Sequence, residues 1–199
     1  MNRFNYTPEE KCLINCAIRN NIPWSDPRMK PVRDKIKYYY LQKQNFQCCY
    51  CKRKLTDFNF ENHIEHILPK SKYKKTRFSP FNLAVSCPRC NLKIKKADIS
   101  FLAYPFECFD KMDSDSYHFL HPNLDIYEHH IAHKIVKLDQ LHIEKYLFHP
   151  MDSKAQYTYC YFELRELECE SINVAQGLPP TEILNCIFSQ LKEMIGRQP

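Results

Sequence analysis

At 199 residues, 44% of them apolar, the chain suits a single domain of ordinary size or a small catalytic module with an accessory lobe. Only 2 residues are glycine, which argues against a glycine-rich phosphate-binding loop and against ATPase activity in the chain itself. The net charge of +6 is unevenly distributed: residues 52–96 carry 12 Lys and Arg against 3 Asp and Glu, and residues 97–199 carry 8 against 16. No run approaches the roughly 18 apolar residues of a membrane span, so no membrane association is expected.

Two short helices are expected in residues 1–47. The sequence Thr7-Pro8-Glu9-Glu10 offers a threonine N-cap, a proline at the first helical position and a glutamate placed to close a capping box. Apolar residues then recur at helical spacing, and again in a second segment: Leu13, Ile14, Ala17 and Ile18, then Val32, Ile36, Tyr39 and Tyr40. The stretch 20–23, ending in proline, stops the first helix. Core packing is the favoured role of tyrosines 38–40, and stacking on nucleic-acid bases is the alternative.

Four of the 11 cysteines form two Cys-x-x-Cys pairs, Cys48 with Cys51 and Cys87 with Cys90, with 35 residues between the pairs. This spacing predicts a tetrahedral Zn²⁺ site, because each turn presents two thiolates and the metal joins two distant turns. With four protein ligands the zinc would be structural. The remaining cysteines are predicted to be small buried apolar residues: Cys12, Cys16, Cys49, Cys108, Cys160, Cys169 and Cys186. No apolar signal segment follows Met1, so a reducing cytoplasmic location is expected.

Two strands and a helix are expected between and after the cysteine pairs. Residues 63–68 alternate in polarity and are bounded by Asn62 and Pro69, which predicts a strand, and residues 79–85 predict a turn leading into a second strand. A helix is expected to begin near Asn91. Side chains alternate along a strand, so His63 and Glu65 would lie on one face and His66 on the other. Strand, loop, strand and helix around one metal make a ββα arrangement.

The residues of this segment suit phosphodiester hydrolysis. That reaction needs a base to deprotonate water and a divalent metal to stabilise the charge on the phosphate. His66 is a suitable base near neutral pH, and the Glu65 carboxylate suits Mg²⁺ or Mn²⁺. Basic residues on both sides of the second strand are predicted to bind nucleic acid, with a solvated basic face as the alternative: Lys70, Lys72, Lys74, Lys75, Arg77, Lys93, Lys95 and Lys96.

Three motifs in this order, Cys-x-x-Cys, Ile-Glu-His-Ile-Leu-Pro-Lys-Ser and Asn-Leu-Ala-Val-Ser-Cys-x-x-Cys-Asn, resemble the HNH endonuclease superfamily of the zinc-knuckle ββα-metal type. The resemblance spans about residues 48–98. It implies that His66 is the general base and that Glu65 binds the catalytic metal. It further implies that Asn82 braces the loop and orients the base, and that Asn91 is the second metal ligand.

Two positions near these motifs leave alternatives open. His63 shares the predicted face of Glu65 and is a further candidate metal ligand, with a solvated or hydrogen-bonding histidine as an equal alternative. Many zinc-type relatives have a lysine three residues after the Cys-Asn pair. Here Ile94 holds that position, between Lys93 and Lys95, so the sequence does not say which lysine contacts phosphate.

The C-terminal part, residues 100–199, is expected to be a mainly helical accessory or partner-docking lobe. Residues 131–150 suggest mixed strands and turns, and residues 154–169 a helix with Tyr157 and Tyr161 on its apolar face, followed by Leu164 and Leu167. Thr181 is predicted to cap a last helix. Histidines 129, 130 and 133 suggest either a second metal cluster on a helix or exposed helix histidines. The predicted whole is an α+β protein with N-terminal helices in 1–47, a ββα-metal nuclease core in 48–99 and this lobe.

A second resemblance covers more of the chain. The N-terminal helices, the nuclease motifs and residues 119–127, Phe-Leu-His-Pro-Asn-Leu-Asp-Ile-Tyr, are similar to PtuB-type HNH proteins of Septu and retron-linked anti-phage systems. That similarity implies a DNA-cleaving effector acting with a PtuA-type ATPase partner. Three alternatives remain: an RNase, including one that cuts tRNA; a non-catalytic zinc-knuckle nucleic-acid-binding module; and a homing or restriction nuclease, which would need a base-reading module.

Overall fold

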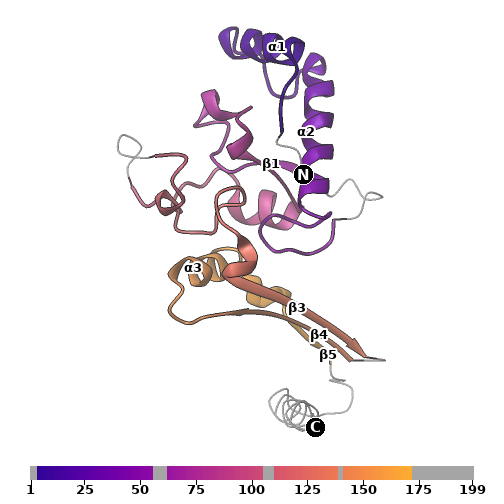
Figure 1. Ribbon diagram of the computed structural model, residues 1–199, viewed down its shortest axis with the longest axis vertical. Helices are drawn as coiled ribbons and strands as arrows, with labels where there is room; N and C mark the ends of the chain where they lie inside the picture. The colour runs from indigo at the N-terminus through magenta and orange to yellow at the C-terminus, as the bar shows by residue number, and fades with distance from the viewer. Residues whose placement is uncertain (1–3, 56–61, 105–109, 139–140, 172–199) are drawn as a thin grey trace.

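The computed structural model describes residues 4–55, 62–104, 110–138 and 141–171 (Figure 1). Helix α1, Pro8–Arg19, and helix α2, Lys30–Lys43, confirm the two predicted N-terminal helices. The capping box of α1 is complete: Thr7 accepts from the Glu10 N–H at 3.2 Å, and the Glu10 carboxylate accepts from the Thr7 N–H at 2.7 Å. Among the residues that the structure describes, no helix is both long and apolar enough to cross a bilayer.

Strands β1, His63–His66, and β2, Leu83–Ser86, form an antiparallel pair in which Glu65 lies opposite Ala84. The first strand is shorter than predicted. After His66 the side chain of Asn82 accepts from the Leu68 N–H at 2.6 Å, so a side chain replaces the strand partner and the ladder ends. Short 3₁₀ turns, Lys74–Thr76 and Pro80–Asn82, occupy the connection. A seven-residue π-helical segment, Arg89–Lys95, follows β2, and α2 packs against both strands.

The described residues of the C-terminal lobe do not confirm a mainly helical lobe, because they contain a three-stranded sheet as well as short helices. Strands β3 (Ile131–Leu138), β4 (Leu141–Phe148) and β5 (Cys169–Ser171) form an antiparallel sheet in the order β3-β4-β5, and the β3–β4 pair extends away from the centre of the molecule (Figure 1). Further 3₁₀ turns, Ser114–Ser116 and Tyr127–His129, precede the sheet.

The helix predicted for residues 154–169 is interrupted. Helix α3 spans Ser153–Tyr161, and Glu163 adopts the left-handed conformation with φ of 49° before the 3₁₀ turn Leu164–Leu167. The break directs Phe162 and Leu164 into the core, where both are fully buried. The last predicted helix, capped by Thr181, lies outside the described residues.

The predicted histidine cluster does not form on a helix, because β3 begins at Ile131. His130 Nδ1 lies 2.7 Å from Asp152 Oδ2, and His133 Nε2 lies 2.9 Å from Glu144 Oε1. His133 also stacks on the Tyr146 ring with centroids 4.4 Å apart. In the described part of the chain, the four paired cysteines are the one group of three or more His, Cys, Asp or Glu ligands close enough to share a metal ion.

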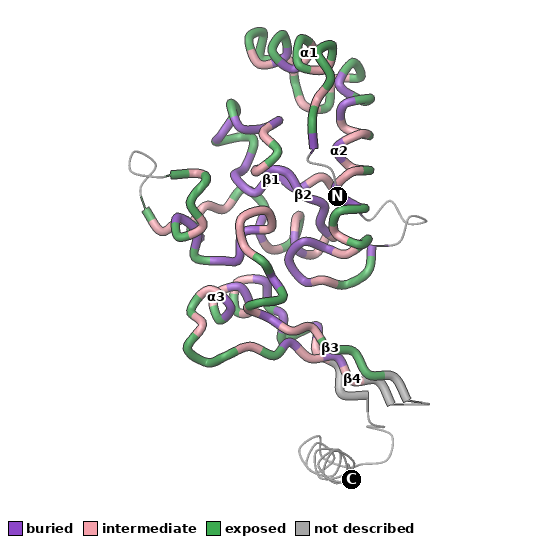
Figure 2. The backbone as a smooth tube through the Cα atoms, in the orientation of Figure 1, coloured by how far each residue is buried: buried purple, intermediate pink, exposed green. Residues whose placement is uncertain are grey.

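The buried residues lie mostly around β1, β2 and the cysteine turns, while α1 and residues 134–136 of β3 are largely exposed (Figure 2). Cys49 is buried, as predicted, but Cys12, Cys16 and Cys160 are exposed. Helices α1 and α3 each have one buried stripe, and these three residues lie outside it. The predictions for Cys108, Cys186 and the side chain of Cys169 fall outside the described residues.

His121 gives the fold a pH-dependent stability. It is fully buried, its Nδ1 accepts from the Asn123 N–H at 3.2 Å, and burial lowers its pKa to about 3. The folded state therefore holds the imidazole neutral, while the unfolded chain takes up the proton below pH of about 6.5. Stability from His121 is complete above that pH and is lost as the pH falls.

We predict that wild type loses about 1.4 kcal/mol more unfolding free energy than His121→Gln between pH 7.5 and pH 5.5. Urea unfolding at both pH values measures the difference, with the exposed His149→Gln as the matched control. Equal pH dependence in wild type and His121→Gln would contradict the prediction.

Candidate active site

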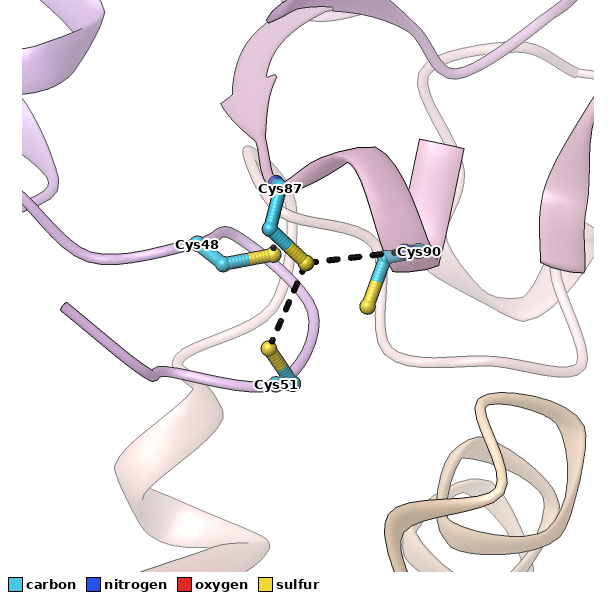
Figure 3. Close-up of side chains that lie close together, drawn as sticks. All are labelled: Cys48, Cys51, Cys87 and Cys90. Atoms are coloured by element: carbon cyan, nitrogen blue, oxygen red, sulfur yellow. Dashed lines mark hydrogen bonds between the residues drawn. The ribbon is translucent and has the colours of Figure 1, made fainter. Parts of the chain in front are cut away.

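The side chains of Cys48, Cys51, Cys87 and Cys90 converge, as Figure 3 shows. Their sulfur atoms all lie within 4.8 Å of one another, and the Sγ atoms of Cys51 and Cys87 are 3.8 Å apart. A tetrahedral zinc with Zn–S distances of about 2.3 Å separates its sulfurs by about 3.8 Å. The Cys87 N–H donates to Cys48 Sγ at 3.4 Å and the Cys90 N–H to Cys87 Sγ at 3.5 Å, and such donors stabilise thiolates. The cluster therefore fits a structural Zn²⁺.

The four thiols compete for ionisation when no cation is bound. Burial raises the pKa of Cys48, but hydrogen bonds from the neighbouring thiols bring that pKa well below its usual range. The hydrogen bond to Cys48 in turn raises the pKa of Cys51 and of Cys90. A divalent cation removes this competition, because all four sulfurs bind it as thiolates.

The C-terminal lobe contacts both cysteine turns. The Tyr146 hydroxyl of β4 donates to the carbonyl oxygen of Cys51 at 2.6 Å. Arg89, in the second cysteine turn, donates to the carbonyl oxygens of Phe162 at 2.7 Å and Glu163 at 2.9 Å. The interruption after α3 thus presents carbonyl groups to Arg89, and the lobe supports the zinc site from two sides.

Glu65 is held in the core by Tyr50 of the first cysteine turn and by Lys95 of the π-helical segment. Its Oε1 accepts from the Tyr50 hydroxyl at 3.0 Å and lies 2.8 Å from Lys95 Nζ. Tyr50, between Cys48 and Cys51, is itself fixed by stacking on Phe162, with ring centroids 4.0 Å apart. Burial raises the pKa of Glu65, and Lys95 and Tyr50 act in the opposite direction. The carboxylate is consequently oriented by the zinc turn and by the π-helical segment together.

His66 is buried and forms a T-shaped ring contact with Trp24, at a centroid distance of 4.5 Å. Its Nε2 lies 3.1 Å from the carbonyl oxygen of Arg77. A carbonyl can only accept, so Nε2 carries the hydrogen and Nδ1 keeps a lone pair. Burial, with a contribution from Lys70, lowers the pKa of His66 to about 3. The imidazole is therefore neutral and available as a base at physiological pH.

Asn82 joins the two ends of the loop after β1. It is fully buried, and its Oδ1 accepts from the Leu68 N–H at 2.6 Å. Its Nδ2 lies 3.1 Å from the Leu68 carbonyl oxygen and 3.2 Å from that of Thr76. These contacts fix the loop that carries Arg77, whose carbonyl orients His66.

A cleft of about 530 Å³ brings the candidate catalytic residues together. Its lining includes Glu65, His66 and Asn91, and also Lys70, Lys74 and Lys96. His63 does not line this cleft. It lies in an adjoining hollow of about 350 Å³ that shares Asn91 and Lys70 with the cleft, and burial lowers its pKa.

The predicted basic residues divide into an exposed group and a buried pair. Exposed members of the set are Lys70, Lys72, Lys74, Lys75, Lys93 and Lys96. Arg77 and Lys95 are buried, although Arg77 also lines the cleft. Arg77 donates to the Ala17 carbonyl oxygen at 2.7 Å, and Lys95 pairs with Glu65. Lys95 is thus engaged inside the protein and is not among the cleft-lining residues, whereas Arg77 borders the cleft.

The residues predicted to hold Mg²⁺ or Mn²⁺ have suitable donor chemistry. The Glu65 carboxylate and the Asn91 carboxamide line one cleft and offer the oxygen ligands that these ions prefer. Such ions keep several water or phosphate oxygens, so few protein ligands suffice. The set fits a hard divalent cation, although Oε1 of Glu65 already accepts two hydrogen bonds.

Sequence reasoning missed Tyr50 and Trp24 as residues of this site and gave Lys95 a different role. Tyr50 orients Glu65, Trp24 packs on His66, and Lys95 is internal. Trp24 is the one tryptophan of the chain and Tyr50 stands between two predicted zinc ligands, so the sequence could have marked both as residues of the site. Nothing local distinguished Lys95 from the lysines beside it.

We predict one Zn²⁺ per chain in wild type and none in Cys87→Ser. Structural zinc contributes about 10–16 kcal/mol in small zinc domains, which is comparable with a whole domain's stability of about 5–15 kcal/mol. Cys87→Ser should therefore lose its cooperative unfolding transition. Metal analysis and calorimetry measure both effects, with the exposed Cys160→Ser as control. Zinc retention and normal unfolding in Cys87→Ser would contradict the assignment.

A comparison with known protein families gives a match to the segment that contains the cysteine pairs and the candidate catalytic residues. Residues 48–97 match the family model described as HNH endonuclease. No curated protein and no solved structure matches the chain. The matched residues include both cysteine pairs, β1, β2 and the π-helical segment. Residues 48–97 therefore resemble an HNH endonuclease domain and carry a four-cysteine cluster compatible with zinc, which suggests nuclease activity.

Proposed function

We propose that the protein is a metal-dependent endonuclease that hydrolyses DNA phosphodiester bonds, with residues 48–99 as a ββα-metal core. The observation that carries the proposal is the shared cleft of Glu65, His66 and Asn91, bordered by exposed lysines. A binding module has no need for a buried neutral imidazole beside a buried carboxylate. The HNH family model over residues 48–97 supports the same reaction class.

His66 acts as the general base in this proposal. Its Nε2–H is held by the Arg77 carbonyl, so Nδ1 accepts the proton of the attacking water. Asn82 keeps that carbonyl in place through the loop it braces. A divalent cation, when bound by Glu65 and Asn91, stabilises negative charge on the phosphate. Lys70, Lys74 and Lys96 bind neighbouring phosphates, which positions the chain without reading its sequence.

We further propose a cytoplasmic role in anti-phage defence beside a PtuA-type ATPase. Support comes from the PtuB-like motifs and from the scarcity of glycine, which leaves nucleotide chemistry to a partner. The acidic residues 100–199 would offer the docking surface, beyond the contacts that the lobe makes with the cysteine turns. The division into 1–47, 48–99 and 100–199 is part of this proposal.

The test is cleavage of supercoiled plasmid and of total tRNA by zinc-loaded protein with Mg²⁺ or Mn²⁺. We expect His66→Ala to lower the rate about 10²- to 10⁴-fold, because a positioned base contributes that much, and Asn91→Ala to lose activity as well. His149→Ala, an exposed histidine outside the cleft, should cut like wild type.

Each result discriminates between functions. Cleavage of tRNA with intact plasmid would make the protein an RNase of the same mechanism. Equal cleavage by all variants would place the activity elsewhere than at His66. Nucleic-acid binding without cleavage by wild type, alone or with a co-purified ATPase, would favour the zinc-knuckle binding module.

A further inference from the structure

Lys95 is a fully buried lysine that contacts both members of the Glu-His pair. Its Nζ lies 2.8 Å from Glu65 Oε1 and donates to the carbonyl oxygen of His66 at 3.0 Å. The side chains of Lys95 and Glu65 are only 1% and 2% exposed, and the Phe101 ring lies 5.5 Å from the ammonium. An ammonium group in such surroundings is tolerated because a carboxylate neutralises it.

The backbone of the π-helical segment explains how Lys95 reaches this position. The Lys96 N–H donates to the Asn91 carbonyl oxygen at 2.8 Å, a bond that spans five residues instead of four. The wide turn leaves Asn91 at the cleft and Lys95 in the core, while Lys93 stays exposed. One short segment therefore supplies both the candidate amide ligand and a cation for Glu65.

The Lys95 ammonium reduces the net negative charge that the Glu65 carboxylate presents to a metal ion in the cleft. Glu65 is the one carboxylate among the described residues that line the cleft, and its charge is already balanced by Lys95. Carboxylate charge is a main source of affinity for Mg²⁺ and Mn²⁺. Two cations on one buried carboxylate repel each other, and the repulsion is strong where water is excluded.

We propose that Lys95 is an internal competitor of the divalent metal at Glu65, which keeps the metal affinity of the free protein low. The inference rests on the proposed function of the cleft and adds a regulation of it. In the metal-free protein, the ammonium holds Glu65 and strand β1 in place. Phosphates in the cleft add negative charge that favours the metal, so metal and nucleic acid bind cooperatively. Lys95 is a positioning residue and contacts no substrate.

The test measures Mn²⁺ binding to zinc-loaded protein without nucleic acid, from the electron paramagnetic resonance signal of free Mn²⁺. Lys95→Met should bind Mn²⁺ at least tenfold more tightly than wild type, and Lys95→Arg should remain weak because it keeps the charge. Lys93→Met removes an exposed lysine of the same segment and should stay within twofold of wild type. Adding Glu65→Gln to Lys95→Met should abolish the gain.

Unchanged Mn²⁺ affinity in Lys95→Met would overturn the inference, as would an equal gain in Lys93→Met. If Lys95→Met does not fold alone, because the charge of buried Glu65 is then uncompensated, it is refolded with Mn²⁺. Recovery of the folded circular dichroism spectrum by Mn²⁺ supports competition, and failure to recover contradicts it. Because no substrate is present, these outcomes are independent of whether wild type cleaves nucleic acid.

Discussion

The convergence of four cysteine sulfurs is the constraint on which the rest of the candidate site depends. The first cysteine turn carries Tyr50, and the second leads directly into the segment that carries Asn91 and Lys95. Tyr50 and Lys95 both contact the same oxygen of Glu65. A zinc ion that joined the two turns would therefore fix the two side chains that orient the carboxylate, and with four cysteine ligands it would have no open position for catalysis.

Burial of charged and polar groups at this site costs desolvation free energy, and it also fixes the orientation of these groups. Glu65, His66 and Lys95 are all withdrawn from water, and each is matched by a partner: an ammonium, a backbone carbonyl or a carboxylate. Such groups are held in place before the reaction, and their interactions are stronger than they would be in water. The same arrangement links His66 and Glu65 of strand β1 to Lys95 of the π-helical segment.

The C-terminal lobe has a structural role that its acidic composition does not reveal. Tyr146 and Phe162 reach the first and second cysteine turns, across 95 and 73 residues of sequence. Phe162 also stacks on Tyr50, so the lobe supports Glu65 indirectly. A segment of about 50 residues, such as the one that the HNH family model matches, is too small to bury this many polar groups by itself. The lobe completes the core, and any partner must dock on what remains exposed.

The sequence by itself determined the features whose causes are local. A capping box, two Cys-x-x-Cys turns, a proline turn before β2 and an alternating strand each follow from residues within a few positions of one another. The tertiary structure alone decided the register in which residues 131–148 pair, the burial of Lys95 and Arg77 while Lys75, Lys93 and Lys96 stay exposed, and the contact of Tyr50 with Glu65. The physical reason is that a charged side chain can be buried only where a partner, often distant in the sequence, compensates its charge. Neighbouring lysines have the same side chain, and they differ only in whether the fold supplies such a partner.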